Sequence, residues 1–377
     1  MLSPSYVVDT VYQKQKIKDR TKQFFMMLFF ICRHDILGAM SKEPKEPKES
    51  KTLEIAIAQL ERQFGIGSVM ILGNKKSEPW PAVSTGALPL DNILGIGGLP
   101  LGRVVEIYGP ESSGKSTLAL SLVAEAQKMG LTCAYIDAEH ALDPVYMTAV
   151  GVDLNKLLLA QPSYGEEGLE IVDMLIRTGE IGVVIVDSVA SLIPKAELEG
   201  DMESSQMGLQ ARMMAKAMRK LVSLANENKT LIVFINQIRN KIGVMFGNPE
   251  TTPGGFALRY AASVRLDIRK KEDIKDKLGN SIGVKVKVKV IKNKMSPPMK
   301  LTEFDIMYGK GIDKLGCVFD AAMQVGVFTQ KGAWVYYRGE SFSQGREQAI
   351  TKIREDENLL KELKELITNG VLPDQLS

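Results

Sequence analysis

The sequence predicts an α/β protein: a mostly parallel central sheet, preceded by an N-terminal helix and followed by a small α+β C-terminal domain. Three observations predict this fold. Strand-like aliphatic runs alternate with helical stretches between 103 and 309, a pattern typical of βαβ units. Several runs end in polar residues, as strands do where a ligand binds at the carboxyl edge of a parallel sheet. From 313 onward the alternation gives way to short helices around a hairpin-like segment, 334–342.

The first element expected is an amphipathic helix at 53–64, which stops before Gly65 and Gly67. It follows a charged, proline-bearing linker at 41–50 that cannot bury apolar area and is expected to be disordered. Such a helix can pack on its own core or on a neighbouring subunit, and we expect it to be an oligomerisation segment.

The apolar run 24–32 near the start is too short to cross a bilayer. The residues after it lack the small side chains of a signal-peptide cleavage site. We expect 1–39 to be an upstream extension without a role in function, with Met40 as an alternative start. An organellar targeting segment is the alternative, and it is disfavoured by the acidic residues Asp9, Asp19 and Asp35.

The core elements are expected in the order that the chain presents them. Strands are expected at 103–108, 132–138, 182–188, 230–236, 263–269, 284–291 and 301–308. Helices are expected at 116–129, 165–178 and 207–227. The domains that follow are 1–50 (extension and linker), 51–85 (N-terminal helix segment), 86–312 (core) and 313–377 (small C-terminal domain). In the last of these, Arg338–Gly339 is expected to form a hairpin turn.

Composition narrows the class of protein. With 45% hydrophobic and 25% charged residues, the chain resembles an average globular protein rather than a disordered or membrane-embedded one. The net charge of +3 says little about nucleic acid, because a local basic surface matters more than the total. Three separated cysteines, Cys32, Cys133 and Cys317, suggest neither zinc nor disulfides and fit a reducing, cytoplasmic setting. Two histidines leave the chemistry to carboxylates, lysines and backbone amides.

A phosphate-binding loop follows the first core strand. The motif G-x-x-x-x-G-K-S stands between a strand and a helix, where backbone amides and the helix dipole favour phosphates. Lysine in this motif reaches the β- and γ-phosphates, and the serine hydroxyl binds Mg²⁺. The nucleotide-binding residues expected here are Gly109, Pro110, Glu111, Ser112, Ser113, Gly114, Lys115, Ser116 and Thr117.

Carboxylates end two further strands. Asp187 closes an apolar strand, where a buried acid needs a cation or hydrogen bonds, so it is the expected second Mg²⁺ ligand beside Ser116. Asp137 and Glu139 end the 132–138 strand, and Glu139, which lies farther out, is the favoured base for the attacking water. The alternative for Glu139 is a salt bridge at a strand end.

A fourth strand ends in Asn236 and Gln237, whose amides can sense a γ-phosphate. The segment 238–253 after it is long for a connection inside a compact core, which favours a functional loop. An earlier segment, 199–208, has a similar composition.

Taken together, these motifs resemble the family of bacterial RecA recombinases from about 53 to about 345. The motifs in order are G-P-E-S-S-G-K-S, I-D-A-E-H-A-L-D-P, M-G-L-Q-A-R-M-M, F-I-N-Q-I-R and G-V-M-F-G-N-P-E-T-T. The resemblance implies a RecA-like P-loop ATPase core that binds ATP and Mg²⁺ between subunits. It also implies a helical homo-oligomeric filament on single-stranded DNA, strand exchange with double-stranded DNA, and promotion of self-cleavage of the DNA-damage-response repressor. No membrane partner is implied.

The resemblance assigns roles to single residues. Glu139 resembles the water-activating base, Asp187 the magnesium-side acid and Gln237 the γ-phosphate sensor, while Asp143 and Tyr146 resemble adenine contacts. Residues resembling the DNA-binding loops are Met207, Arg212, Arg219, Ile242, Gly243, Val244, Met245, Gly254 and Gly255. An aliphatic wedge and phosphate-binding arginines suit single strands without reading base identity. For Met207, packing within a helix interface is the alternative.

The run 284–294 alternates valine with lysine. Alone, it is typical of a solvated face or a protected sheet edge. By the resemblance, Lys292 and Lys294 at its end reach the γ-phosphate of a neighbouring subunit. Departures from the family are Ser116 in place of the commoner threonine, Asn240 and Pro253 at the second loop, and an end without an acidic tail, from which weaker autoinhibition of DNA binding is expected.

Two other classes compete with a strand-exchange ATPase. A ring helicase or a repair ATPase with a zinc finger shares the core, but the latter needs C-x-x-C pairs that this sequence lacks. Another P-loop enzyme, such as a small-molecule kinase, would need a substrate pocket and lid and no lysines acting between subunits.

Overall fold

The computed structural model describes residues 51–69, 79–200, 208–240 and 249–369. The chain divides into two compact units, Met1–Glu78 and Pro79–Ser377. In the first unit, helix α2 (Lys51–Phe64) confirms the predicted amphipathic helix. Ile55 is 59% exposed and Phe64 66%, so this helix carries an apolar face that the described residues leave uncovered.

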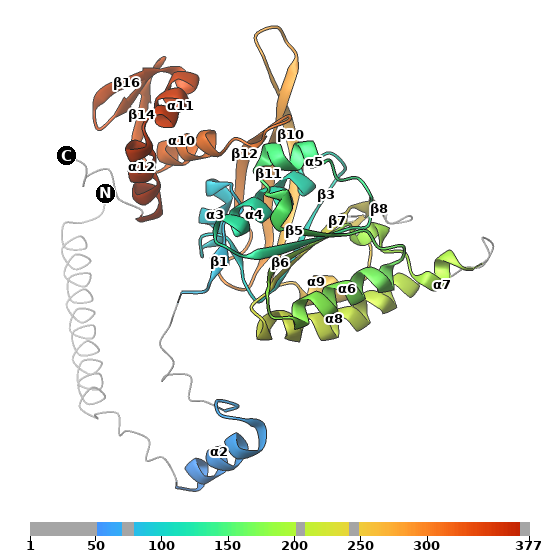
Figure 1. Ribbon diagram of the computed structural model, residues 1–377. Helices are drawn as coiled ribbons and strands as arrows, with labels where there is room; N and C mark the ends of the chain where they lie inside the picture. The colour runs from blue at the N-terminus through green and yellow to red at the C-terminus, as the bar shows by residue number, and fades with distance from the viewer. Residues whose placement is uncertain (1–50, 70–78, 201–207, 241–248, 370–377) are drawn as a thin grey trace, which may run out of the picture. The chain divides into compact units, whose positions relative to one another are not determined.

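The second unit is built on a central sheet (Figure 1). Among the described residues the sheet has nine strands in the order β13-β12-β11-β10-β3-β7-β6-β4-β5. The strands from β10 to β5 pair in parallel. They are β10 (Val264–Lys275), β3 (Val104–Gly109), β7 (Leu231–Gln237), β6 (Ile181–Asp187), β4 (Thr132–Asp137) and β5 (Leu157–Ala160). The mostly parallel sheet of the sequence prediction is confirmed.

The other side of the sheet is antiparallel. β11 (Ser281–Asn293) pairs with β10 and with β12 (Leu301–Met307), and β12 pairs with β13 (Gly311–Ile312). The valines of β11 are buried and its lysines face the other way, so the alternating run is a solvated face. The edge-strand alternative is wrong, because β11 has a partner on each side.

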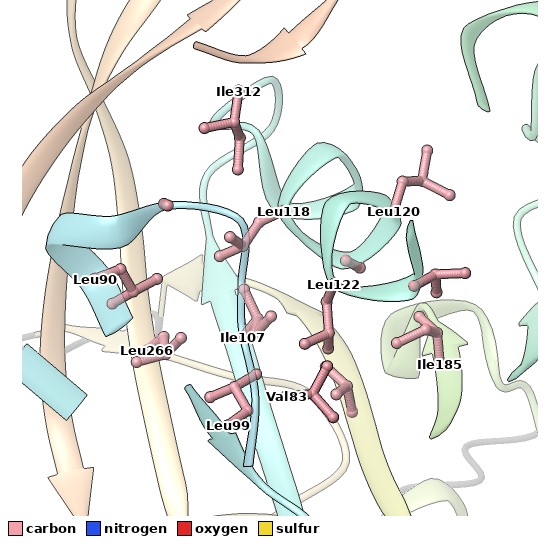
Figure 2. Packing of buried hydrophobic residues seen from close by; sticks show 14 of the residues in the cluster. Val83, Leu90, Leu99, Ile107, Leu118, Leu120, Leu122, Ile185, Leu266 and Ile312 are labelled. Carbon is pink, nitrogen blue, oxygen red and sulfur yellow. The ribbon is translucent and has the colours of Figure 1, made fainter. Parts of the chain in front are cut away.

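Helices cover both faces of the sheet. On one face lie α3 (Leu88–Leu94), α4 (Lys115–Lys128) and α5 (Pro144–Val150), and on the other α6 (Gly165–Arg177), α8 (Leu209–Glu227) and α9 (Ala257–Ala261) (Figure 1). Figure 2 shows Leu118 and Leu122 of α4 packed over Ile107 of β3, at the centre of the first core cluster. A second cluster fills the α6–α8 face. Two buried faces explain why the parallel strands are apolar almost throughout.

Shorter elements complete this unit. A two-stranded sheet joins β1 (Ala82–Val83) to β2 (Leu99–Pro100), and another joins β8 (Arg239–Asn240) to β9 (Glu250–Thr251). Within the described part of this unit, the 3-10 helices are η2 (Leu154–Lys156) and η3 (Val189–Ser191), and α7 (Lys195–Leu198) is a single turn. Among the described residues, no helix is long and apolar enough to cross a bilayer.

The C-terminal segment has its own apolar cluster. It contains α10 (Lys314–Gln324), α11 (Gly345–Glu355), α12 (Glu357–Asn369) and the antiparallel strands β14 (Phe328–Lys331), β15 (Trp334–Tyr337) and β16 (Glu340–Gln344). The predicted hairpin turn joins β15 to β16, where Arg338 and Gly339 both have positive φ. The predicted division of the chain into four domains stays a prediction.

One buried acid makes stability depend on pH. Burial raises the pKa of Asp91 to about 6, against hydrogen bonds from Ser84 and Thr85. Because the folded pKa lies above the unfolded one, the carboxyl stabilises the fold fully below about pH 4, and this contribution is lost as pH rises through about 6. We expect Asp91→Asn to flatten this part of the pH profile of the unfolding free energy, measured by urea denaturation. A variant that keeps the wild-type slope would contradict this.

Candidate nucleotide site

The phosphate loop has the backbone that the motif requires. β3 leads into 110–114, and α4 begins at Lys115. Gly114 adopts φ 91°, a left-handed conformation that favours glycine. A Cβ at Gly109 would lie 2.0 Å from the Ile268 carbonyl oxygen, so a side chain there would displace the neighbouring strand. Glycine at 109 thus lets β3 lie close to β10, and glycine at 114 permits the turn into α4, whose N-terminus favours phosphates.

Lys115 lies across the mouth of this loop. Its Nζ donates a hydrogen bond of 2.6 Å to the Pro110 carbonyl. Burial lowers the pKa of the lysine, while nearby carboxylates, Asp187 foremost, act in the opposite direction. A phosphate can replace the carbonyl as the partner of this half-buried cation. The attraction between the two charges is stronger there than in bulk water.

Ser116 and Asp187 place two oxygen ligands side by side. The Ser116 hydroxyl donates to Asp187 Oδ2 over 2.8 Å, and the Tyr135 hydroxyl donates to the same oxygen over 2.7 Å. Burial raises the pKa of Asp187 despite these two bonds. A buried carboxylate beside a hydroxyl at the end of a phosphate loop fits Mg²⁺, which is held in such sites by few protein oxygens and by substrate phosphates.

Glu139 and Gln237 meet in front of this pair. Gln237 Nε2 donates to Glu139 Oε1 over 3.0 Å, and the Ser188 hydroxyl donates to the same oxygen over 2.5 Å. Glu139 is exposed, so water can reach its carboxylate. Asp137 is 2% exposed and accepts from the Ala141 amide and from a glutamine, so it holds the strand end in place.

The predicted adenine contacts lie on α5. The Tyr146 hydroxyl is 2.7 Å from Thr117 Oγ1, which ties α5 to the first turn of the loop helix. Asp143 caps α5 by accepting from the Val145 amide over 2.9 Å. Both residues therefore have structural bonds, and their contact with a base stays a prediction.

Comparison with known proteins identifies the family. The family model for the RecA N-terminal domain matches residues 51–313, and that for the RecA C-terminal domain matches 316–371. The chain belongs to the RecA family. It is 56% identical to Protein RecA of Rhodospirillum centenum over 81% of this chain and 86% of the relative. It is 52% identical to Protein RecA of Streptomyces venezuelae over 86% of each chain, and 54% identical to that of Sinorhizobium fredii over 85% of this chain and 89% of the relative.

Membership of the RecA family makes the chain a recombinase with DNA-dependent ATPase activity, acting in DNA recombination and repair and in the response to DNA damage. The family assignment replaces the helicase and kinase alternatives. Among solved structures, the chain is also similar to the RadB recombinase, with a TM-score of 0.48 and 23% identity over 61% of this chain and 98% of that chain.

The structure describes some of the predicted RecA-type DNA contacts. Arg212 and Arg219 are exposed on α8. Gly254 and Gly255 both have positive φ and pack against Val189 and the first turn of α8. The other predicted contacts, Met207, Ile242, Gly243, Val244 and Met245, lie outside the described residues.

The two predicted γ-phosphate lysines lie away from the loop of their own chain. In the strand register Lys292 lies opposite Arg265 of β10. The Lys294 amide donates to the Ser263 carbonyl, just before β10 begins. The phosphate loop follows the opposite, carboxyl end of β3. Lys292 Nζ instead donates to the carbonyls of Arg259 and Tyr260 at the end of α9, 3.0 Å each. Within one subunit these lysines do not join the phosphate loop.

Several site residues were missed by sequence reasoning. Tyr135 precedes Asp137 by two residues along β4 and so lies on the same face, which means that the strand period could have placed it near the site. Ser188 follows Asp187 directly. Arg239, which donates to Gln237 Oε1 over 3.1 Å, gave no signal beyond its position after the strand. Asn236, whose amide was predicted together with that of Gln237 to sense a γ-phosphate, is fully buried and donates to Glu106 and to the Pro253 carbonyl.

Proposed function

We propose that ATP binds with its phosphates in the 109–117 loop and with Mg²⁺ held by Ser116 and Asp187. The observation that carries this proposal is the bond between Glu139 and Gln237, because it joins the expected base to the residue that opens the second loop segment. Mg²⁺, when bound, neutralises charge on the phosphate oxygens.

In the proposed reaction Glu139 accepts a proton from the attacking water. The Ser188 and Gln237 bonds fix the orientation of its carboxylate before ATP arrives. A γ-phosphate offers the Gln237 amide a stronger partner, so that Gln237 exchanges its bond to Glu139 for one to ATP. The strand end that precedes the second loop then reports which nucleotide is bound.

The proposed assembly is a helical filament of this chain on single-stranded DNA that takes up double-stranded DNA for strand exchange. Arg212 and Arg219 supply charge for phosphates, and the loop segments supply contacts to the strand. We extend the proposal to a cytoplasmic location and to promotion of self-cleavage of the DNA-damage-response repressor, both supported by family membership.

The test of this function is the dependence of ATP hydrolysis on DNA. We expect phosphate release to rise sharply with oligothymidylate, and binding of that strand to weaken with salt, each phosphate contact adding about 0.7 to the log-log slope. ATP hydrolysis that is indifferent to DNA would sink the proposal.

A second prediction concerns the lysines between subunits. Lys292→Ala should lower DNA-saturated ATP hydrolysis at least about tenfold, because a cation is lost from the neighbour's γ-phosphate. Hydrolysis by dilute, DNA-free protein should change little. Lys300→Ala, an exposed lysine beside the same strand, is the control. An equal loss in dilute and assembled protein would rule out action between subunits.

A further inference from the structure

One peptide group at the end of the second loop segment is held from two sides. The Pro253 carbonyl accepts from Asn236 Nδ2 over 3.2 Å, and the Gly254 amide donates to Gln210 Oε1 over 3.1 Å. Both oxygen and N–H of the Pro253–Gly254 peptide are thus bonded to side-chain amides. We call this peptide the loop anchor.

Each of the two amides also reaches the nucleotide side of the sheet. Asn236 Oδ1 accepts from the Gln237 amide over 3.0 Å, directly before the expected γ-phosphate sensor. Gln210 Nε2 donates to the carbonyls of Val189 and Leu192, over 2.9 and 3.2 Å, in the turn that follows Asp187 and Ser188. The loop anchor is therefore linked through Asn236 to the end of β7 and through Gln210 to the turn after β6.

Packing makes this contact close. A Cβ on Gly254 would lie 2.8 Å from Val189 Cγ1, and one on Gly255 would lie 2.8 Å from the Ala211 Cβ. Asn236 is fully buried and is further held by Glu106 Oε1 over 3.0 Å, so it has little freedom to move alone. Gln210 comes from the start of α8, immediately after the first loop segment. Its side chain bonds both to the end of the second loop segment and to the turn after Ser188.

We propose that Gln210 is a positioning residue that couples nucleotide state to DNA binding. Movement at Glu139 passes through its bond with Ser188 to the 189–192 turn, and from there through Gln210 to the loop anchor. The inference rests on the proposed function, because it assumes that the two loop segments bind DNA. Gln210 touches neither the nucleotide nor, in this proposal, the DNA; it fixes the loop's carboxyl end relative to the turn.

The test compares Gln210→Met, which keeps the length of the side chain and removes its bonds, with Gln127→Met. Gln127, on α4, is the matched control: its side-chain amide also bonds to backbone atoms through both its oxygen and its nitrogen, to Asp153 N and O at 2.8 and 2.9 Å. The affinity for fluorescein-labelled oligothymidylate is measured with ADP and with adenosine 5′-O-(3-thiotriphosphate). We expect the affinity with the thiotriphosphate, divided by the affinity with ADP, to fall about tenfold in Gln210→Met. The same ratio should remain at the wild-type value in Gln127→Met.

A retained ratio in Gln210→Met would overturn the inference. If Gln210→Met does not fold, Gln210→Glu has the same shape and lacks the donor for the two carbonyls, so it should lose the ratio in the same way. Thermal unfolding of the variants separates lost stability from lost coupling, since both glutamines should stabilise the fold to a similar extent. If the wild-type protein binds DNA equally well with ADP and with the thiotriphosphate, the proposed function itself is contradicted.

Discussion

Lys115→Ala will abolish DNA-dependent ATP turnover, lowering kcat at least about a hundredfold. The Lys115 ammonium is half-buried at the mouth of the phosphate loop, where it donates a hydrogen bond of 2.6 Å to the Pro110 carbonyl. In the proposed site, alanine removes the Lys115 cation from the bound phosphates, in a place where water screens charge poorly. Phosphate release at saturating oligothymidylate measures the effect.

The control for this variant is on the same helix. Lys128→Ala removes an exposed lysine whose bond to Glu125 lies within the last turns of α4, an interaction of little energy at the surface. It should turn over ATP as the wild type does. Thermal unfolding of both variants checks that α4 is intact. Normal turnover by Lys115→Ala would disprove the assignment of this loop as the catalytic nucleotide site.

Glu139→Ala should bind ATP and fail to hydrolyse it, with a loss of about a hundredfold to ten-thousandfold, the contribution of a positioned general base. The loop, Lys115 and Asp187 are untouched, so nucleotide binding survives. If bound ATP keeps the protein in its DNA-binding state and hydrolysis releases it, the variant should also hold labelled oligothymidylate long after a competitor strand is added. Single-turnover hydrolysis and strand dissociation are the two measurements.

Glu170→Ala, an exposed glutamate on α6, provides a control for the loss of one surface acid. If Glu139→Ala hydrolyses ATP normally, the choice of base is wrong, and Asp137 is the neighbouring acid to examine. Asp137 is 2% exposed and bonded to Gln161, so its removal should lower stability as well as activity. The stability measurement distinguishes the two acids.

Much of the fold could be predicted because both faces of the sheet are covered. A strand buried on both faces is apolar almost throughout, and β6 and β7 show this in the printed sequence. The four-residue β5 was missed, since a run this short has no recognisable period. β10 and β11 extend beyond the predicted ends as a charged two-stranded hairpin, where no core requires apolar residues.

The site was predictable where chemistry is concentrated in contiguous residues. The phosphate loop can be recognised by the spacing of its residues, and the acids at strand ends by the cost of burying a charge. The partners that orient them do not. Ser188, Tyr135 and Gln210 act through bonds to residues remote in sequence, and a glutamine at the start of a helix carries no pattern that distinguishes it from a solvated one.

The separation of Lys292 and Lys294 from their own phosphate loop has a consequence for how activity scales with assembly. If every working site needs a loop from one subunit and lysines from the next, an open row of subunits always has one fewer complete site than it has members. A lone subunit then has none, and short rows hydrolyse less ATP per subunit than long ones. Turnover per molecule becomes a measure of length, and the incomplete site at one end marks the direction in which the row can grow.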